Sequence, residues 1–162
     1  MAEDIIQSIS NILIERQQSI AVAESVTSGH MQVALSAAPD AAHFYQGGIT
    51  AYNLGQKSRH LHVEPIHAMT CNCVSQQVAT EMALEVCRLF VSDWGLAITG
   101  YASKVPESNN ELFAYFAISY AGRILQSGKI EPPDGEPVQV QSFYANELLK
   151  NLEALLQHTL QE

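Results

Sequence analysis

The sequence has few cysteines, few positive charges and no long apolar run. Three cysteines in 162 residues are an odd and low count, typical of reduced thiols rather than of a disulfide framework. Eight Lys and Arg against 17 Asp and Glu give a net charge of -9, which argues against a nucleic-acid partner. No apolar segment approaches the roughly 20 residues that a membrane-spanning helix needs.

The N-terminal segment carries acidic residues ahead of its apolar part, so it does not look like a secretory signal. Without a signal or a membrane span, we expect a cytoplasmic protein. Hydrophobic residues make up 47% of the chain, which is ample for a sizeable core, and the length fits one domain, residues 1–162.

Apolar periodicity divides the chain into alternating helices and strands. It predicts helices over 4–17, from about 30 to 37, after Asn53, after Ser75 and over 141–160. Short apolar or aromatic runs predict strands over 20–23, 49–52, 94–100, 112–120 and 124–130. We expect an irregular connection across residues 64–74. This alternation, with one late hairpin, predicts an α/β fold: a three-layer α/β/α sandwich with a mixed, mostly parallel sheet.

The segment from Ser19 to His30 passes from a buried strand, IAVA, into a hydroxyl-rich turn and then a helix. Open α/β sheets bind ligands at the carboxyl ends of their strands, and free N–H groups at a helix start suit an anion or an oxyanion. We expect Thr27 or Ser28 to cap that helix. The alternative is that these hydroxyls do nothing more than cap it.

A second group of residues has the chemistry of metal ligands. His60 and His62 share a face if their segment is extended, and His67, Cys71 and Cys73 follow. Nitrogen and sulfur ligands suit zinc, but this spacing matches no compact zinc signature. We therefore favour surface histidines and half-buried thiols, and no metal site, over a zinc site. Cys87 is expected to pack in the core.

Four short motifs occur in a familiar order. They are AESVTSG at 23–29, GGITAYN at 47–53 with Lys57 just beyond, VS at 74–75 at a helix start, and ITG at 98–100. Together they resemble the C-terminal domain of the competence- and damage-inducible CinA family, over nearly the whole chain. That family includes nicotinamide mononucleotide deamidases, which hydrolyse the nicotinamide amide to a carboxylate and release ammonia.

The resemblance implies a serine amidase. Ser25 matches the nucleophilic serine of the AES motif, Lys57 the lysine that acts as base, and Tyr52 a tyrosine that relays a proton or orients the pair. A lysine can act as a base if burial lowers its pKa, and N–H groups after Ser25 can form an oxyanion hole. Glu24 either orients Lys57 or faces water.

The resemblance also implies a substrate site for a small-molecule amide or nucleotide. Its residues would be Thr27, Ser28, Gly29, Thr99 and Gly100. The scheme needs no metal and no cofactor. The exposed faces of the first and last helices are candidates for a homo-oligomer interface.

Part of the family pattern is missing from this chain. A glycine-rich loop normally follows the TG pair, whereas here the chain reads YASKVPESNNEL, and Gln139 and Gln141 stand where an arginine is usual. Side chains with a Cβ cannot adopt the same φ values cheaply, so this loop must differ in shape. The chain is therefore either an amidase, for this or another substrate, or a non-catalytic relative that binds a small ligand or a protein.

Each matched residue also has a purely structural alternative. Ser25 can satisfy backbone groups at a strand end, and Tyr52 can be an aromatic residue at the edge of the core. Lys57 can be an exposed helix lysine. Only their collinear match to the family raises all three together as candidates for catalysis.

Overall fold

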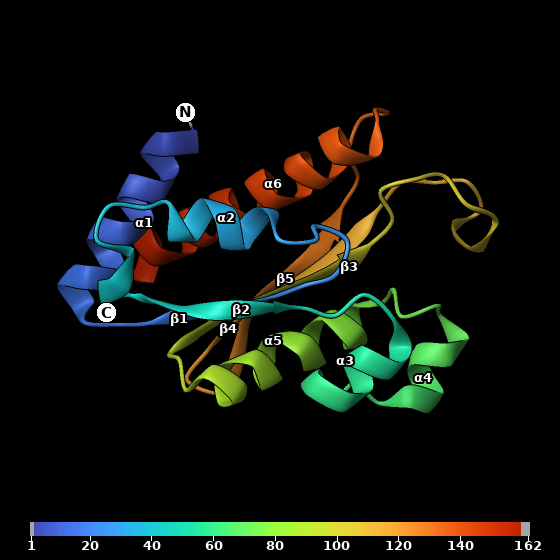
Figure 1. Ribbon diagram of the computed structural model, residues 1–162, viewed down its shortest axis with the longest axis horizontal. Coiled ribbons are helices and arrows are strands. Elements are labelled where there is room, and N and C mark those ends of the chain that lie inside the picture. Colours follow the sequence, from blue (N-terminus) through green and yellow to red (C-terminus); the bar gives the residue numbers. More distant parts are fainter. Residues whose placement is uncertain (1, 160–162) are drawn as a thin grey trace.

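The computed structural model describes residues 2–159, in which five strands form one sheet of order β2-β1-β3-β4-β5 (Figure 1). The strands are β1 (Ile20–Glu24), β2 (Tyr45–Thr50), β3 (Trp94–Gly100), β4 (Ala114–Tyr120) and β5 (Arg123–Ile130). β1 pairs in parallel with β2 and β3, whereas β4 is antiparallel to both β3 and β5. All strands except β4 therefore run in one direction, and the predicted mixed sheet is confirmed.

Helices cover both faces of the sheet (Figure 1). One layer holds α1 (Ala2–Arg16), α2 (His30–Ser36) and α6 (Pro137–His158). The other holds α3 (Leu54–Leu61), α4 (Pro65–Thr70) and α5 (Gln76–Phe90). Short 3-10 turns lie at Ala41–His43 and Pro106–Ser108. This arrangement confirms the predicted three-layer α/β/α sandwich.

The alternation of side-chain size along β1 sets the spacing of the two layers. Ile20 and Val22 point into the core shared with α1 and α6, while Ala21 and Ala23 point into the core shared with α5. Successive strand residues face opposite sides of the sheet, so small residues on one side allow α5 to approach closely. Gly95 of β3 shows this approach, since a Cβ there would lie 2.4 Å from the Ala83 carbonyl oxygen of α5.

Several element boundaries differ from those predicted. Residues 65–70 form helix α4, where an irregular connection was expected, because Glu64 accepts hydrogen bonds from the N–H groups of Ile66 and His67 at the helix start. β2 begins at Tyr45 and includes the glycines that had indicated a turn. A Cβ on Gly48 would lie 2.6 Å from Val22 Cγ2, so glycine allows the two strands to pair there.

The last helix starts at Pro137 instead of 141, because proline at the first helical position loses no hydrogen bond. The predicted end of this helix at residue 160 lies outside the described residues. Within residues 2–159, no helix combines the length and the apolar character needed to cross a membrane.

β1 is the point at which the chain changes direction across the sheet. The chain leaves β1 for β2 on one side and then returns to β3 on the other. In α/β sheets such a reversal opens a crevice at the carboxyl ends of the two strands. Ser25 follows β1 at this point, and Gly100 ends β3 beside it.

Candidate active site

Ser25 is held at the carboxyl end of β1 by hydrogen bonds to both neighbouring strands. Its N–H donates to the Ile98 carbonyl of β3 at 3.2 Å. On the other side, the carbonyl of the preceding residue, Glu24, accepts from the N–H of Ala51, which directly follows β2, at 2.9 Å. The Ser25 side chain lies at the floor of a cleft, with only 6% of the residue exposed. The serine is therefore fixed by the sheet and not by a mobile loop.

Glu24 has a different role from either one expected. It is fully buried, and its two carboxylate oxygens accept hydrogen bonds from the N–H groups of Met31 and Gln32 at 2.9 and 3.0 Å. These N–H groups belong to the first turn of α2, so Glu24 satisfies that helix start from the preceding strand. The capping expected of Thr27 or Ser28 is therefore wrong; the residue before α2 is Gly29, at φ +103°, with no side-chain cap.

Lys57 reaches Ser25 from the other side of the cleft. It lies on α3, whose start is fixed by Asn53 accepting the Gln56 N–H. Its amine nitrogen, Nζ, is 2.7 Å from Ser25 Oγ and donates to the Tyr52 carbonyl oxygen at 3.1 Å. Burial of the amine away from water lowers the pKa of Lys57 from 10.5 to about 8, although the neighbouring Cys73 thiol opposes this shift.

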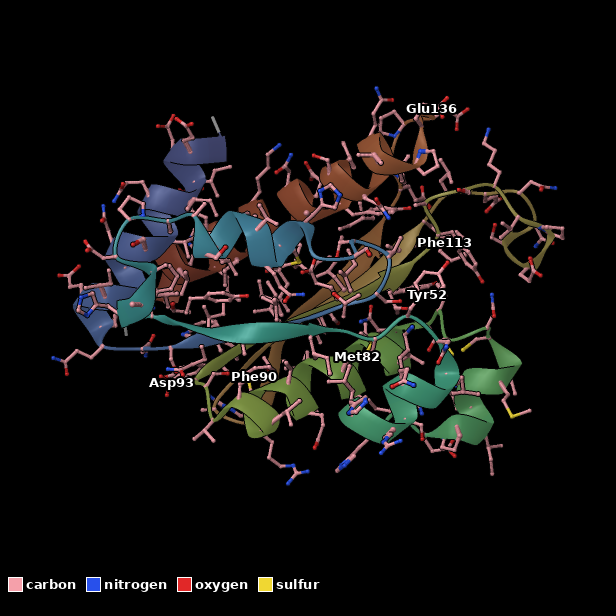
Figure 2. All side chains as sticks on the ribbon, in the orientation of Figure 1. Tyr52, Met82, Phe90, Asp93, Phe113 and Glu136 are labelled. Carbon is pink, nitrogen blue, oxygen red and sulfur yellow. The ribbon has the colours of Figure 1, made fainter. Side chains whose placement is uncertain are left out.

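The Tyr52 phenol is not brought to the Ser25–Lys57 pair. Tyr52 is 78% exposed at the edge of the cleft, on the loop between β2 and α3 (Figure 2). Its contact with Lys57 is made by the backbone carbonyl oxygen. In this geometry Tyr52 orients the amine through its backbone.

The cleft has a volume of about 750 Å³, within the usual range for small-molecule sites. Thr99 and Gly100 lie in its wall, as the resemblance implies. The Thr99 hydroxyl donates to the Cys73 carbonyl oxygen at 2.7 Å and so fixes the segment before α5. Gly100 has no room for a side chain, since a Cβ would lie 2.4 Å from that of Ala114.

The other three residues implied to bind substrate do not line the cleft. Ser28 is exposed, Gly29 is half-buried, and Thr27 is fully buried beneath the turn. The Thr27 hydroxyl oxygen has no hydrogen-bond partner among the described residues. Among the described residues, no acceptor is hydrogen-bonded to the backbone N–H group of Val26 or to that of Thr27, the two residues that follow Ser25 directly.

The loop that replaces the glycine-rich segment forms the outer wall of the cleft. Tyr101 and Ser103 line the cleft without closing it. The Tyr101 carbonyl oxygen accepts a hydrogen bond from the buried Tyr144 hydroxyl at 2.7 Å, and the Tyr101 hydroxyl accepts one from Asn72 at 3.2 Å. Lys104 turns away and pairs with Asp134 at 3.0 Å.

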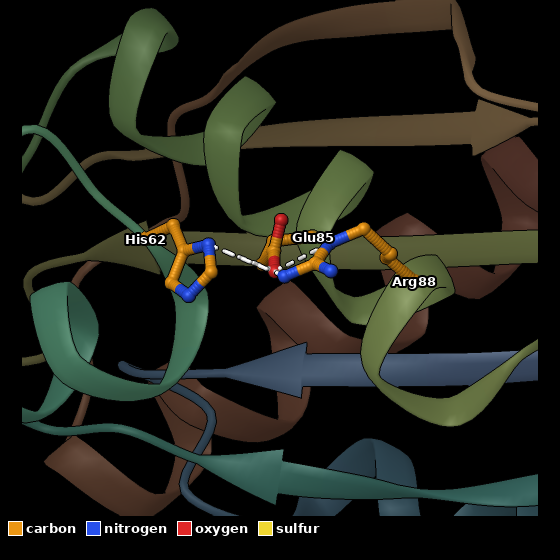
Figure 3. A network of polar contacts seen from close by, with 3 residues as sticks. All are labelled: His62, Glu85 and Arg88. Atoms are coloured by element: carbon orange, nitrogen blue, oxygen red, sulfur yellow. Dashed lines mark hydrogen bonds and ion pairs between the residues drawn. The ribbon is translucent and has the colours of Figure 1, made fainter.

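The candidate metal ligands do not gather in one cluster, although the Cys71 thiol lies 3.7 Å from His67 Nε2. His62 pairs with Glu85 at 3.1 Å, and Arg88 contacts the same carboxylate (Figure 3). His60 contacts Gln56, and His67 contacts the Ser75 hydroxyl at 2.8 Å. Across residues 2–159, no three His, Cys, Asp or Glu side chains are grouped as a metal site would require.

Comparison with known proteins agrees with the motif order. The sequence-family model for the CinA C-terminal domain matches residues 2–156. This chain belongs to the CinA C-terminal domain family. A CinA-like protein of Prochlorococcus marinus is 36% identical over 121 residues, which cover 74% of this chain and 28% of that protein.

A putative competence-damage inducible protein of Desulforamulus reducens is 33% identical over 96% of this chain and 38% of its own length. The chain thus spans a quarter to two-fifths of these curated CinA-type relatives. A CinA superfamily protein from Klebsiella pneumoniae has the same fold, with TM-score 0.91, 25% identity and coverage of 98% and 99% of the two chains. A competence or damage-inducible protein from Enterobacter asburiae has a TM-score of 0.90 and 26% sequence identity, and the match covers 96% of this chain and 98% of that chain.

Several cleft residues were missed by reasoning from the sequence. Met69 and Asn72 come from α4 and the turn after it, which were expected to be irregular. The pair Glu64-Pro65 is a helix-start signal that would have predicted α4. Glu107 lies in the replaced loop, where no periodic pattern predicts which side chains face the cleft.

Proposed function

We propose that the cleft hydrolyses a small primary amide, with Ser25 as nucleophile and Lys57 as general base. The observation that carries this proposal is the 2.7 Å distance between Lys57 Nζ and Ser25 Oγ. A serine hydroxyl becomes a nucleophile when a base within hydrogen-bond reach takes its proton. A pKa of about 8 leaves a useful fraction of the Lys57 amine neutral near physiological pH.

The reaction proceeds in two halves. Ser25 Oγ attacks the carbonyl carbon of the amide while its proton passes to Lys57 Nζ. The C–N bond then breaks, Lys57 returns the proton to the departing nitrogen, and ammonia leaves an acyl ester on Ser25. Water attacks this ester with Lys57 again as base, which releases the carboxylic acid and restores the serine.

The negative charge of the tetrahedral intermediate needs donors beside Ser25. The N–H groups of Val26 and Thr27 follow the nucleophile directly and have no other acceptor among the described residues. Backbone donors held in place before the reaction stabilise an oxyanion without reorganising. We assign the oxyanion hole to these two groups. The Tyr52 carbonyl oxygen holds the Lys57 amine toward the serine.

The family resemblance suggests nicotinamide mononucleotide as the first substrate to test, together with related nicotinamide amides. Ammonia release is measured for wild-type protein, Ser25→Ala and Lys57→Ala, with circular dichroism to verify folding. The matched controls are Ser36→Ala and Lys150→Ala, which change exposed residues outside the cleft. Turnover that both cleft substitutions abolish and both controls retain supports the proposal. Turnover that survives Ser25→Ala contradicts it.

A second candidate is a non-catalytic protein that binds a small ligand. It is favoured by the altered outer wall, where Tyr101 occupies a position that is glycine-rich in the family. A folded wild-type protein that binds an amide in the cleft but releases no ammonia would support this candidate.

A further inference from the structure

The lining of the cleft is almost free of charge. Of the described residues that line it, only Lys57 and Glu107 have side chains that carry a full charge near pH 7. The Lys57 amine lies at the floor and is engaged by Ser25 Oγ and the Tyr52 carbonyl oxygen. Among residues 2–159, no arginine or second lysine lines the cleft to bind a phosphate, which proteins usually hold with such side chains.

The helix start after β1 cannot serve as a substitute phosphate site. In many α/β proteins the N–H groups of the helix after the first strand bind a phosphate. Here the N–H groups of Met31 and Gln32 already bond to the Glu24 carboxylate, which is fully buried. A phosphate at this place would meet a fixed negative charge as well as occupied donors.

The positive charge on the outer wall is also engaged. Lys104 lies in an adjoining recess and pairs with Asp134 at 3.0 Å. Glu107, in contrast, is exposed at the cleft lining and forms no ion pair with any described residue. The free charge at the mouth of the cleft is therefore negative, and it disfavours an anionic substrate.

We infer that the amide bound by this cleft carries no phosphate and is either uncharged or cationic. This inference rests on the proposed function, because it names the substrate class of the same site. Glu107 attracts a cationic group, and the aromatic rings of Tyr52 and Tyr101 at the cleft favour a planar cation. A nicotinamide nucleoside has this chemistry, whereas its 5′-phosphate adds two negative charges that have no partner here.

Binding and turnover are measured separately, so that the two proposals can fail separately. Isothermal titration calorimetry on Ser25→Ala protein compares nicotinamide riboside, nicotinamide mononucleotide and nicotinamide. We expect the riboside to bind at least about tenfold more tightly than the mononucleotide at low salt, because salt screens the opposing charges. Ammonia release by wild-type protein is measured with the same three compounds.

Each outcome has a definite meaning. Tighter binding of the riboside supports the inference, even if no ammonia is released; in that case the amidase proposal fails while the charge preference stands. Equal or tighter binding of the mononucleotide overturns the inference, even if the amidase proposal succeeds. Binding of none of the three compounds also overturns it.

Two substitutions test the residues that carry the inference. Glu107→Gln should weaken riboside binding by about threefold, as for an exposed charge pair, and leave nicotinamide binding unchanged. Glu111→Gln is the matched control, since Glu111 is exposed in the same segment but does not line the cleft. Gln141→Arg, which adds a guanidinium to the cleft wall, should tighten mononucleotide binding by about tenfold. Unchanged binding in both variants would overturn the inference.

Discussion

The floor and the outer wall of the cleft are built in different ways. The floor consists of Ser25 and Lys57, which are 6% and 1% exposed and are held by neighbouring strands and a helix. The outer wall is the loop from Tyr101 to Glu107 together with the start of α6, and most of its residues are partly or fully exposed (Figure 1).

This difference separates the chemistry from the choice of substrate. Rigid elements hold reacting groups within the narrow tolerance that catalysis requires, whereas loops vary without disturbing the core. The motif residues Ser25 and Lys57 lie at the floor, and the segment that replaces the family's glycine-rich loop forms the outer wall. Substitutions at the floor should therefore change rate and stability strongly, and substitutions at the wall should change mainly binding.

The largest effect is expected for Lys57→Met. Loss of the base should lower kcat by at least about 1000-fold. The same change should stabilise the fold. A lowered pKa means that the charged amine is less favourable in the folded protein than in the unfolded protein, so its removal raises the free energy of unfolding. The shift from 10.5 to about 8 corresponds to about 3 kcal/mol, and lost hydrogen bonds offset about 1, leaving a gain of about 2 kcal/mol at pH 7.

Urea unfolding at several pH values measures this gain. Between pH 8 and 10.5 the unfolded wild-type protein binds more protons than the folded protein, so its unfolding free energy rises with pH. The advantage of Lys57→Met should therefore shrink across this window. Lys150→Met, at an exposed position of α6, serves as the control and should show no such trend. If Lys57→Met protein were less stable than the wild type at pH 7, the prediction that the buried, charged amine destabilises the fold would be wrong.

The next effect is the pH dependence of turnover. The base is the neutral amine, so kcat/KM should rise about tenfold per pH unit well below the Lys57 pKa and level off above about pH 8. The profile is measured from pH 6 to 9.5 with the best amide substrate. A profile that is flat from pH 6 to 8 would exclude Lys57 as the base.

A smaller effect, on the free energy of unfolding, is expected for Glu24→Gln at the end of β1, directly before Ser25. The neutral amide keeps only one oxygen to accept the N–H groups of Met31 and Gln32, so we expect a loss of about 1–3 kcal/mol in unfolding free energy. Glu64→Gln is the matched variant, since Glu64 also accepts two helix N–H groups but is exposed. The loss measured by urea unfolding should be clearly larger for Glu24→Gln. Equal losses would contradict a structural role for the buried carboxylate.

Most of the fold was predicted from local patterns in the sequence, whereas Ser25 and Lys57 were brought together as candidates only by the resemblance to the CinA family. The run IAVA predicts a buried strand, and the collinear motifs place Ser25 and Lys57 in one site. What the sequence did not predict depends on packing across the sheet. Gly47-Gly48 indicated a turn, but strand pairing with β1 extends β2 through both glycines.

The same reason explains the roles that were predicted wrongly or missed. Nothing local shows that the Glu24 carboxylate folds onto the start of α2, or that Tyr52 meets Lys57 through its carbonyl oxygen. The direction in which each side chain of the loop 101–107 points depends on contacts with α6, more than 30 residues away. Such contacts leave no periodic signal in the sequence.

The smallest effect is expected for Tyr101→Phe at the wall. Among the described residues, its hydroxyl accepts a hydrogen bond only from the exposed Asn72, so removal should change unfolding free energy by less than about 0.5 kcal/mol and KM by less than about threefold. Tyr144→Phe removes a buried hydroxyl that supports the same loop at the Tyr101 carbonyl oxygen, and it should cost about 1–2 kcal/mol. Urea unfolding and KM are measured for both variants. If Tyr101→Phe lowers kcat as strongly as a substitution at the floor, the wall takes part in the chemistry and the separation between the two regions is wrong.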